Sequence, residues 1–493
     1  MADWNIFNLQ QIEATKFKDF VKLSRFYASS PVGLMMYRTA VDTSTKFSSQ
    51  PLPFTLLPSP FPKGQFQEAL DLQTHFNTLI HECTLDHEFL LEALEEPAQT
   101  DLFISKLLHL LKECKPYTSK KRVFLNMIRN DYMLHPSTTP EQIKFDLKQV
   151  EINTIAAGFV NIGPRANALH KFTLNYYQEL THSRDNIVLP ENKADELSAL
   201  AMATAYNKYC EVYNAAKSNT IILFIVVSEE KEYNVFDQRP IEVRLFEEHR
   251  IRVRRLTLQS LIDKVTIGDK QELRVDGEEI AVAYFRSGYN EKFYPTEKEW
   301  KVRTIIEQSN TVCVPSIAAH LATFKSIQQK LCEAGAVEKY IKDPNIVKRI
   351  RDTFAEQIAL DGSKKAQDTI ALVRKNPKLY VLKPNKEGGG NNYFDDDILP
   401  VIKAIENTDE MKNHILMQRL NPPDLQMCLV NPNKEAYLTK GNSELGIFGY
   451  YVKVDDKVEM NVEGGHVLRS KDQKDNECGI STGIGYVDSP YLV

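Results

Sequence analysis

The sequence predicts a mixed α/β protein, and three regions of the chain support this prediction. Apolar residues recur every three or four positions over residues 66–80, which is the spacing of an amphipathic helix. Residues 221–227 form a short apolar run rich in branched side chains, typical of a buried strand. Eleven of the 20 glycines lie between residues 388 and 485. Glycine is needed where backbone approaches a ligand closely, so the last third is expected to carry ligand-binding loops.

In the first part of the chain, helices precede the first strand. The helix over 66–80 is followed by a break at Pro97 and by a second helix marked by the apolar spacing over 103–110. Residues 148–155 alternate between apolar and polar side chains, which predicts a strand.

The middle of the chain reads as a compact α/β unit. A helix is expected over 237–248, and strands at 273–275 and 280–285 flank Asp276-Gly277, a hairpin-turn pair. A helical stretch over 318–331 leads out of this unit. The last third is strand-rich, with strands expected at 379–383, 415–418, 445–454 and 458–462.

Composition narrows the range of functions. The formal net charge is −5 and no basic block occurs, so nucleic acid is not an expected partner. No apolar run approaches ~20 residues, so no membrane span is expected. The N-terminus has no apolar leader region, which predicts a cytoplasmic location. The seven cysteines include no C-x-x-C pair, which favours reduced thiols, and no zinc or serine-hydrolase motif is present.

The strongest local motif is a lysine and glycine-rich segment, Lys383 to Asn392, directly after a predicted strand. Its three glycines, Gly388 to Gly390, can turn backbone N–H groups towards phosphate oxygens, and Lys383 can add a positive charge. The spacing matches neither a P-loop nor a dinucleotide-binding turn. The alternative interpretation is a flexible surface turn.

A second motif places Glu151 and Asn153 on the same face of a predicted strand. A carboxylate and an amide oxygen side by side suit Mg²⁺, and Glu387 could add another oxygen. The alternative is a solvated strand face. Three arginines in polar or aromatic surroundings, Arg129, Arg286 and Arg469, could clamp substrate carboxylates, although each alone is typical of a surface salt bridge.

These motifs occur together and in order in eukaryotic glutathione synthetases, and the chain resembles that family over about residues 50–493. The matching segments are FLNMIRNDYM (124–133), QVEINTI (149–155), EEKEYNVFDQR (229–239), VAYFRSGY (282–289), VLKPNKEGGGNN (381–392) and SELGIFG (443–449). The resemblance implies an ATP-grasp fold, in which two α/β modules clamp ATP, and a homodimer. It divides the chain into an N-terminal helical region (1–120), a first part of the ATP-grasp body (121–219), an inserted α/β substrate-binding domain (220–322) and an ATP-grasp domain (323–493).

The resemblance also implies a reaction. The family joins γ-glutamylcysteine to glycine with ATP and Mg²⁺, through an acylphosphate of the dipeptide. It implies catalytic roles for Arg129, Lys383 and Arg469 and Mg²⁺ ligands at Glu151, Asn153 and Glu387.

The remaining roles implied by the resemblance concern ATP and the two substrates. The implied ATP contacts are Glu151, Lys325, Lys383, Glu387, Gly388, Gly389, Gly390, Asn391, Asn392, Met417, Gln418, Arg419, Leu420, Glu444 and Lys471. The implied substrate contacts are Arg129, Ala156, Gly158, Glu232, Asn234, Gln238, Arg286, Tyr289, Arg469, Ile480 and Ser481.

The chain departs from the family pattern at several positions that contact the substrates in the family. Two family serines that contact the dipeptide are replaced by Ala156 and Gly158. The usual Met-Glu-Lys beside adenine is Met417-Gln-Arg419, and a usual tyrosine is Phe394. The closing loop, usually Gly-Gly-Val-Ala-Ala-Gly, is the bulkier Cys478-Gly-Ile-Ser-Thr-Gly483.

Three hypotheses about function remain open from the sequence. The first is a glutathione synthetase. The second is a ligase of the same class with altered donor or acceptor specificity, which would take another small amine in place of glycine. The third is a non-catalytic relative that binds nucleotide or a partner, and the retained Lys383 and Glu151 argue against it.

Overall fold

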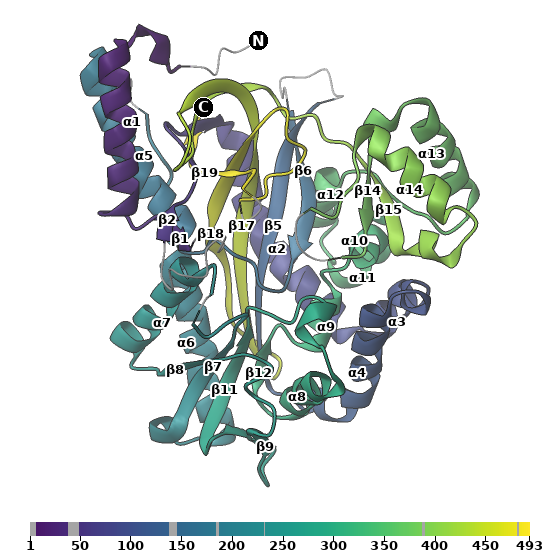
Figure 1. Ribbon diagram of the computed structural model, residues 1–493. Helices are drawn as coiled ribbons and strands as arrows, with labels where there is room; N and C mark the ends of the chain where they lie inside the picture. Colours follow the sequence, from purple (N-terminus) through teal and green to yellow (C-terminus); the bar gives the residue numbers. More distant parts are fainter. Residues whose placement is uncertain are drawn as a thin grey trace.

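The central sheet of the computed structural model has seven strands in the order β16-β3-β19-β18-β17-β5-β6. The structure describes residues 6–37, 49–137, 145–183, 187–230, 232–386, 390–480 and 483–493. The longest strands, β17 and β18, form an antiparallel hairpin along the height of the molecule (Figure 1). The strands of this sheet are β3 (Phe54–Thr55), β5 (Val123–Pro136), β6 (Phe145–Asn153), β16 (Leu425–Val430), β17 (Tyr437–Val454), β18 (Lys457–Asp472) and β19 (Tyr486–Asp488).

A second sheet of six strands lies below the central sheet in Figure 1. Its strands are β7 (Thr220–Ile225), β8 (Val253–Leu256), β9 (Val265–Ile267), β10 (Leu273–Val275), β11 (Glu278–Phe285) and β12 (Val312–Val314). All six residues of β7 are buried, which confirms the predicted buried strand. The predicted hairpin is also confirmed, because Val275 pairs with Glu278 across Asp276 and Gly277, both of which have positive φ.

A smaller module stands to the right in Figure 1, where helices cover a three-stranded sheet of order β13-β15-β14. Its elements are β13 (Gln357–Ala359), α13 (Lys364–Lys375), β14 (Tyr380–Pro384), α14 (Ile398–Ile405) and β15 (His414–Gln418). The module has its own apolar core, in which Leu382 and Leu416 of the sheet pack with Ile370 and Ile402 of the helices. Because this module packs on its own, it can form one wall of a cavity whose other wall is the central sheet.

The predicted N-terminal helices are present as α2 (Lys63–Leu85) and α4 (Leu102–Thr118), with a short turn of 3₁₀-helix from Pro97 between them. The N-terminal 120 residues also contain short strands that the sequence pattern did not predict, one of which, β3, joins the central sheet. The other elements are α1 (Ala14–Ser29), β1 (Met35–Tyr37), β2 (Ser49–Pro51), β4 (Ser59–Phe61), α3 (His87–Leu94), α5 (Ile162–Thr181), α6 (Ala194–Tyr213), α7 (Val235–His249), α8 (Glu297–Gln308), α11 (Ala336–Tyr340), α12 (Pro344–Thr353) and β20 (Pro490–Leu492).

The helical stretch expected over 318–331 is present, but it is interrupted before Lys325. The structure has two short helices there, α9 (Ile317–Leu321) and α10 (Lys325–Cys332). The second helix begins anew because the Ser326 amide donates to the Asn385 side chain at 2.8 Å. A residue distant in sequence thus provides the hydrogen bond that the preceding turn would otherwise supply.

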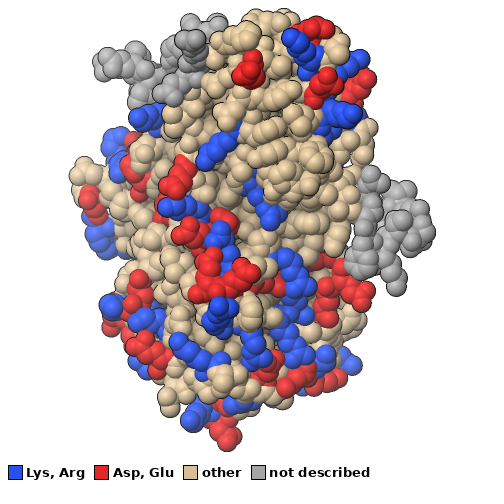
Figure 2. Space-filling model, turned by 90° about the vertical axis from the view of Figure 1, so that its left-hand side faces the viewer, with Lys and Arg blue, Asp and Glu red and all other residues tan. Residues whose placement is uncertain are grey.

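On the face shown in Figure 2, basic and acidic side chains are interspersed and the upper half is mostly uncharged. Within the described residues, no helix is long and apolar enough to cross a membrane. All seven cysteines are free thiols.

Candidate active site

A cavity of about 910 Å³ lies between the central sheet and the three-stranded sheet. Strands β5, β6, β17 and β18 contribute side chains to one wall, and β14 and β15 contribute to the opposite wall. Segments after β7 and β11 close a third side with Glu232, Asn234 and Tyr289. Ligand cavities of ~300–1,000 Å³ enclose drug-sized molecules, so this cavity has room for a nucleotide.

Asp131 is the centre of the charged network on β5. It is fully buried and accepts hydrogen bonds from Arg129 Nε at 2.6 Å and Nη2 at 2.7 Å. It also accepts from Arg469 Nη2 at 2.9 Å and from Asn153 Nδ2 at 3.0 Å. Arg469 contacts Glu444 as well, and although burial disfavours its charge, Glu444 and Asp131 outweigh burial and raise the pKa of Arg469. Arg469 is therefore held in its charged form, and the shared carboxylate of Asp131 fixes the direction of both arginine side chains.

The strand register explains how this network forms. Arg129 and Asp131 lie two residues apart on β5 and so share a face, opposite Asn153 and Glu151 of β6. Gly446 of β17 lies opposite Asp131, and a Cβ atom there would approach Asp131 Oδ1 to 2.8 Å and Arg129 Cδ to 2.9 Å. Glycine is thus required for these side chains to lie across the neighbouring strand. Sequence reasoning missed Asp131, although its spacing from Arg129 was a usable signal.

Two lysines and one carboxylate meet on the side of the cavity facing β14. Lys325 at the start of α10 lies 3.0 Å from Glu151, and Lys383 at the end of β14 donates to the Val150 carbonyl at 3.1 Å. Burial opposes ionisation of Glu151, but Lys325 and Lys383 outweigh it and hold the pKa of this carboxyl well below its usual value. Burial lowers the pKa of Lys383. The cluster presents positive charge from two elements towards one region of the cavity, as phosphate binding requires.

The end of the glycine-rich segment contacts the closing loop. Glu477 accepts hydrogen bonds from the Gly390 amide at 2.6 Å and from Asn392 Nδ2 at 2.8 Å. A carboxylate therefore occupies backbone and side-chain donors of a segment predicted to bind phosphate. Glu387, Gly388, Gly389 and Ser481 were predicted site residues and lie outside the described residues.

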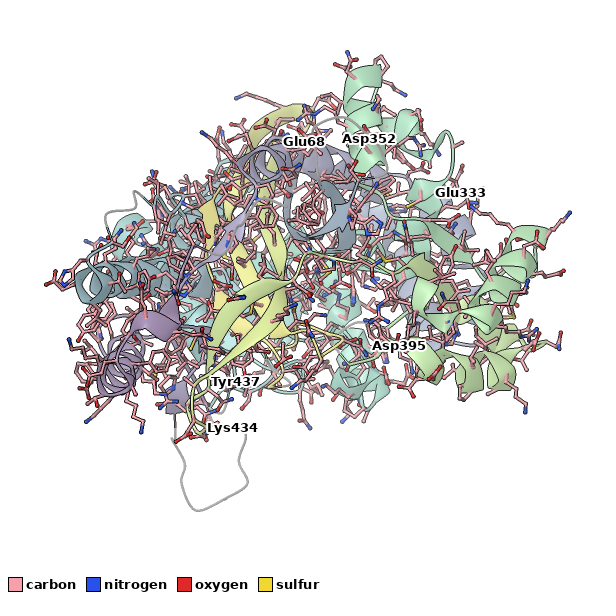
Figure 3. All side chains as sticks on the ribbon, turned by 90° about the horizontal axis from the view of Figure 1, so that it is seen from above. Glu68, Glu333, Asp352, Asp395, Lys434 and Tyr437 are labelled. Carbon is pink, nitrogen blue, oxygen red and sulfur yellow. The ribbon has the colours of Figure 1, made fainter. Side chains whose placement is uncertain are left out.

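Met417 and Gln418 at the end of β15, with Arg419 and Leu420 directly after it, line the cavity. Arg419 forms an ion pair with Asp395 and donates to Asn476 Oδ1, two residues before the closing loop, at 3.1 Å. Asp395 lies where the α13–α14 module faces the long strands (Figure 3). The arginine that replaces the usual lysine thus links this module to the closing loop.

The opposite end of the cavity is formed by a turn after β6. Arg286 is buried and donates to the Ala157 carbonyl at 2.8 Å, and Arg129 donates to the Gly158 carbonyl at 3.1 Å. Ala156 has a φ of 51°, in the left-handed region. The two arginines therefore hold this turn by its backbone.

Glu151 and Asn153 fit a hard cation. The Asn153 nitrogen donates to Asp131, which leaves the amide oxygen for a ligand beside the Glu151 carboxylate. Oxygen ligands of this kind suit Mg²⁺ with water and phosphate completing its shell. Within the described residues, no group of three or more histidine, cysteine, aspartate or glutamate side chains could hold a metal alone.

Most predicted residues come together in this one cavity. Gln238 does not: it is buried and accepts from Arg255 Nη2 at 2.7 Å, away from the cavity lining. Gly390 and Asn391 are also outside the lining. The predicted residues that line it are Arg129, Glu151, Asn153, Ala156, Gly158, Glu232, Asn234, Arg286, Tyr289, Lys325, Lys383, Asn392, Met417, Gln418, Arg419, Leu420, Glu444, Arg469, Lys471 and Ile480.

Two α/β walls that enclose paired lysines and an acidic cluster, with a glycine-rich segment after a strand, are the arrangement of an ATP-grasp protein. Residues 15–492 match the family model described as "Eukaryotic glutathione synthase, ATP binding domain". Among similar proteins, the chain is 34% identical to glutathione synthetase of Xenopus laevis over 90% of each chain. It is 33% identical to that of Macaca fascicularis over 94% of each.

A solved structure, that of a glutathione synthetase-like effector from Globodera pallida in its apo form, covers 98% of each chain with a TM-score of 0.75 at 25% identity. The chain therefore belongs to the eukaryotic glutathione synthase family.

Proposed function

We propose that this protein is an ATP- and Mg²⁺-dependent ligase that joins γ-glutamylcysteine to glycine. One observation carries the proposal. The lysine pair Lys325 and Lys383 and the arginine pair Arg129 and Arg469 line the same cavity. The lysine pair suits the phosphates of ATP, and the arginine pair suits substrate carboxylates. The reaction transfers a phosphoryl group from ATP to a carboxylate, so it needs both kinds of binding group in one cavity.

In the first step, a carboxylate oxygen of the dipeptide attacks the γ-phosphorus of ATP, and ADP leaves with the electrons of the broken bond. Lys383 lies in buried surroundings, so its charge acts on the phosphates with little screening by water. Mg²⁺ held by Glu151 and Asn153 would supply further positive charge to the phosphates. Arg129, fixed by Asp131, orients the dipeptide without reorganisation during reaction.

In the second step, the amine of glycine attacks the acyl carbon and inorganic phosphate leaves. Arg469 is charged and fixed between Asp131 and Glu444, so it can bind the glycine carboxylate. Cys478 and Ile480 of the closing loop line the same region and exclude water from the acylphosphate.

Release of ADP and formation of glutathione, measured together with and without each substrate, test this function. We expect both products only when γ-glutamylcysteine, glycine, ATP and Mg²⁺ are all present. Arg469→Ala should abolish glutathione formation, whereas Arg122→Ala, which removes an exposed arginine that precedes β5 and pairs with Asp455 in the turn after β17, should not. No ADP release with any acceptor would contradict the ligase assignment and favour a nucleotide-binding relative.

A second candidate is a ligase of the same class with altered specificity, favoured by the turn at residues 156–158. Ala156 and Gly158 replace two serines of the family pattern, so two hydroxyl contacts to the dipeptide are missing. A Cβ atom at Gly158 would lie 3.5 Å from Arg286 Nη2, which is ordinary contact distance, so serine fits there. ADP release should be compared across donor dipeptides and acceptor amino acids in the protein and in Gly158→Ser. A preferred donor other than γ-glutamylcysteine, shifted towards it by Gly158→Ser, would support this candidate.

We also propose a cytoplasmic homodimer. The free state of all seven cysteines is compatible with a reducing compartment. Val243 and Phe246 of α7 are half-exposed apolar side chains beside the edge strand β8, and such a surface is suited to association with a second copy. Sedimentation velocity of the protein and of Phe246→Glu tests this, and a monomer at micromolar concentration would contradict it.

A further inference from the structure

A second cavity, of about 290 Å³, lies apart from the proposed active site and shares none of its lining residues. It is enclosed by the ends of α2 and α4, the start of β5, the end of α8, and β12 with α9. Buried Leu111, Leu125, Val312 and Ile317 form an apolar part of its lining, and Asp86, Glu88 and Lys115 contribute charged side chains to the rest. This volume is at the lower limit of ~300–1,000 Å³ for small-molecule sites, so its ligand is smaller than a nucleotide.

Glu307 contributes a buried carboxylate to this cavity. Its side chain is 1% exposed, and Oε2 has no hydrogen-bond partner among the described residues. The nearest basic nitrogen, Arg303 Nη2, is 3.9 Å away and donates instead to the Pro315 carbonyl at 2.9 Å. A distance of 3.9 Å is too long for a hydrogen bond. Buried carboxylate oxygens are almost always hydrogen-bonded, whereas Glu307 Oε2 lacks a donor at hydrogen-bond distance among the described residues, with Arg303 as its ion-pair neighbour at 3.9 Å.

Lys121 contributes the opposite charge. Its ammonium donates to the Thr311 carbonyl at 2.9 Å and contacts Cys313 Sγ at 3.3 Å, which uses two of its three N–H groups. Burial disfavours this charge, but the neighbouring Cys313 and Glu307 outweigh burial and raise the pKa of Lys121. Among the described residues, no carboxylate lies within 4.0 Å of Lys121, so Lys121 and Glu307 line one cavity without pairing.

We propose that this cavity binds a free α-amino acid with an apolar side chain of about leucine size. A zwitterion is the small ligand that satisfies both charges at once, because its ammonium donates to Glu307 and its carboxylate accepts from Lys121. Its side chain then packs against Leu111, Val312 and Ile317. A ligand with one charge would leave the other buried group without a partner, which costs binding energy.

A matched set of three probes tests this proposal on the wild-type protein by isothermal titration calorimetry. The probes are L-leucine, 4-methylpentanoic acid, which lacks the amine, and 3-methylbutylamine, which lacks the carboxylate. We expect one leucine per chain and at least tenfold weaker binding of each single-charge probe. Equal binding of either single-charge probe overturns the zwitterion assignment. No binding of leucine overturns the site and indicates that the cavity holds water.

Two variants locate the binding. Lys121→Met and Glu307→Gln should each weaken leucine binding at least tenfold, because a hydrogen bond to a charged group is lost. Lys298→Met, at an exposed position on α8, is the matched control and should bind leucine normally. Leucine binding that is unchanged in both cavity variants places it elsewhere, for example in the acceptor position of the active site, and overturns the proposal. The probe comparison on wild-type protein remains decisive even for a variant that fails to fold.

Discussion

Replacing Lys383 with methionine should separate phosphoryl-transfer activity from the stability of the fold. Methionine is unbranched and of similar length, so it fills the space of the lysine stem without its charge. Lys383 is buried, 5% exposed, and points into the region where the phosphates are proposed to bind. The substitution therefore removes charge from the site without opening a cavity.

The expected loss of activity follows from electrostatics in a buried site. Removing one preorganised donor to charge that develops in the transition state costs roughly 2.7–4 kcal/mol, or about 10²–10³ in kcat. The expected effect on stability is different. Burial lowers the pKa of Lys383, so the folded state is less favourable for its charge than water is. Lys325 remains 3.0 Å from Glu151 as its ion-pair partner, so replacing Lys383 does not leave the Glu151 carboxylate unpaired. We expect the ligand-free Tm to remain within about 3 °C of wild type.

Steady-state ADP release and thermal unfolding, measured on the same preparation, test both expectations. Lys375→Met, which removes an exposed lysine at the end of α13, is the matched control and should leave both quantities unchanged. Activity of the Lys383→Met protein within threefold of wild type would refute the phosphate assignment. A large loss of Tm together with activity would instead give Lys383 a structural role.

Three further perturbations test separate parts of the structure. Asp131→Asn should lower kcat/KM at least 100-fold and lower the free energy of unfolding by about 3–5 kcal/mol, because two buried arginines lose their shared carboxylate. The control is Asp455→Asn at an exposed position. Measured by the same kinetics and denaturation, it should change neither quantity. Glu477→Gln should tighten ATP binding about fivefold by calorimetry, because a neutral amide competes less well than a carboxylate for the Gly390 amide; weaker binding would show that Glu477 supports the nucleotide complex. His466 has a pKa lowered by burial to about 3, below its unfolded value of ~6.5, so the unfolded state binds the proton first as the pH falls. Stability from neutral His466 is therefore lost between pH 6.5 and 3, and His466→Phe should reduce the pH dependence of the unfolding free energy by about 1.4 kcal/mol per pH unit, a difference that denaturation at pH 6, 5 and 4 measures.

The parts of the fold that sequence predicts well are those with local causes. The hairpin at Asp276 and Gly277 follows from the backbone conformations that these two residues accept. The strand β7 is recognisable because a strand buried on both faces is apolar throughout. The helix break before Lys325 was not predictable in this way. It depends on Asn385, which the fold brings to the start of α10 from another segment.

The site shows the same division. Glu151 and Asn153 could be placed side by side from the period of a strand. The role of Asp131 depends on the register of β5 with β6 and β17, which local sequence does not specify. Gln238 is a different case. The family motif predicts that it contacts the substrate, and in the structure its side chain accepts a hydrogen bond from Arg255 on β8.

Asn476 and Glu477, directly before the closing loop, contact residues on the opposite wall of the cavity. Arg419 links Asp395 to Asn476, and Glu477 binds donors at the end of the glycine-rich segment. Phosphate oxygens must displace the Glu477 carboxylate if they are to use those same donors. If the phosphates use these donors, nucleotide binding requires the Glu477 contacts to break, and the affinity for ATP then includes the cost of breaking them. Because Arg419 is a departure from the family pattern, this cost is expected to differ between this chain and its relatives even where the phosphate-binding lysines are the same.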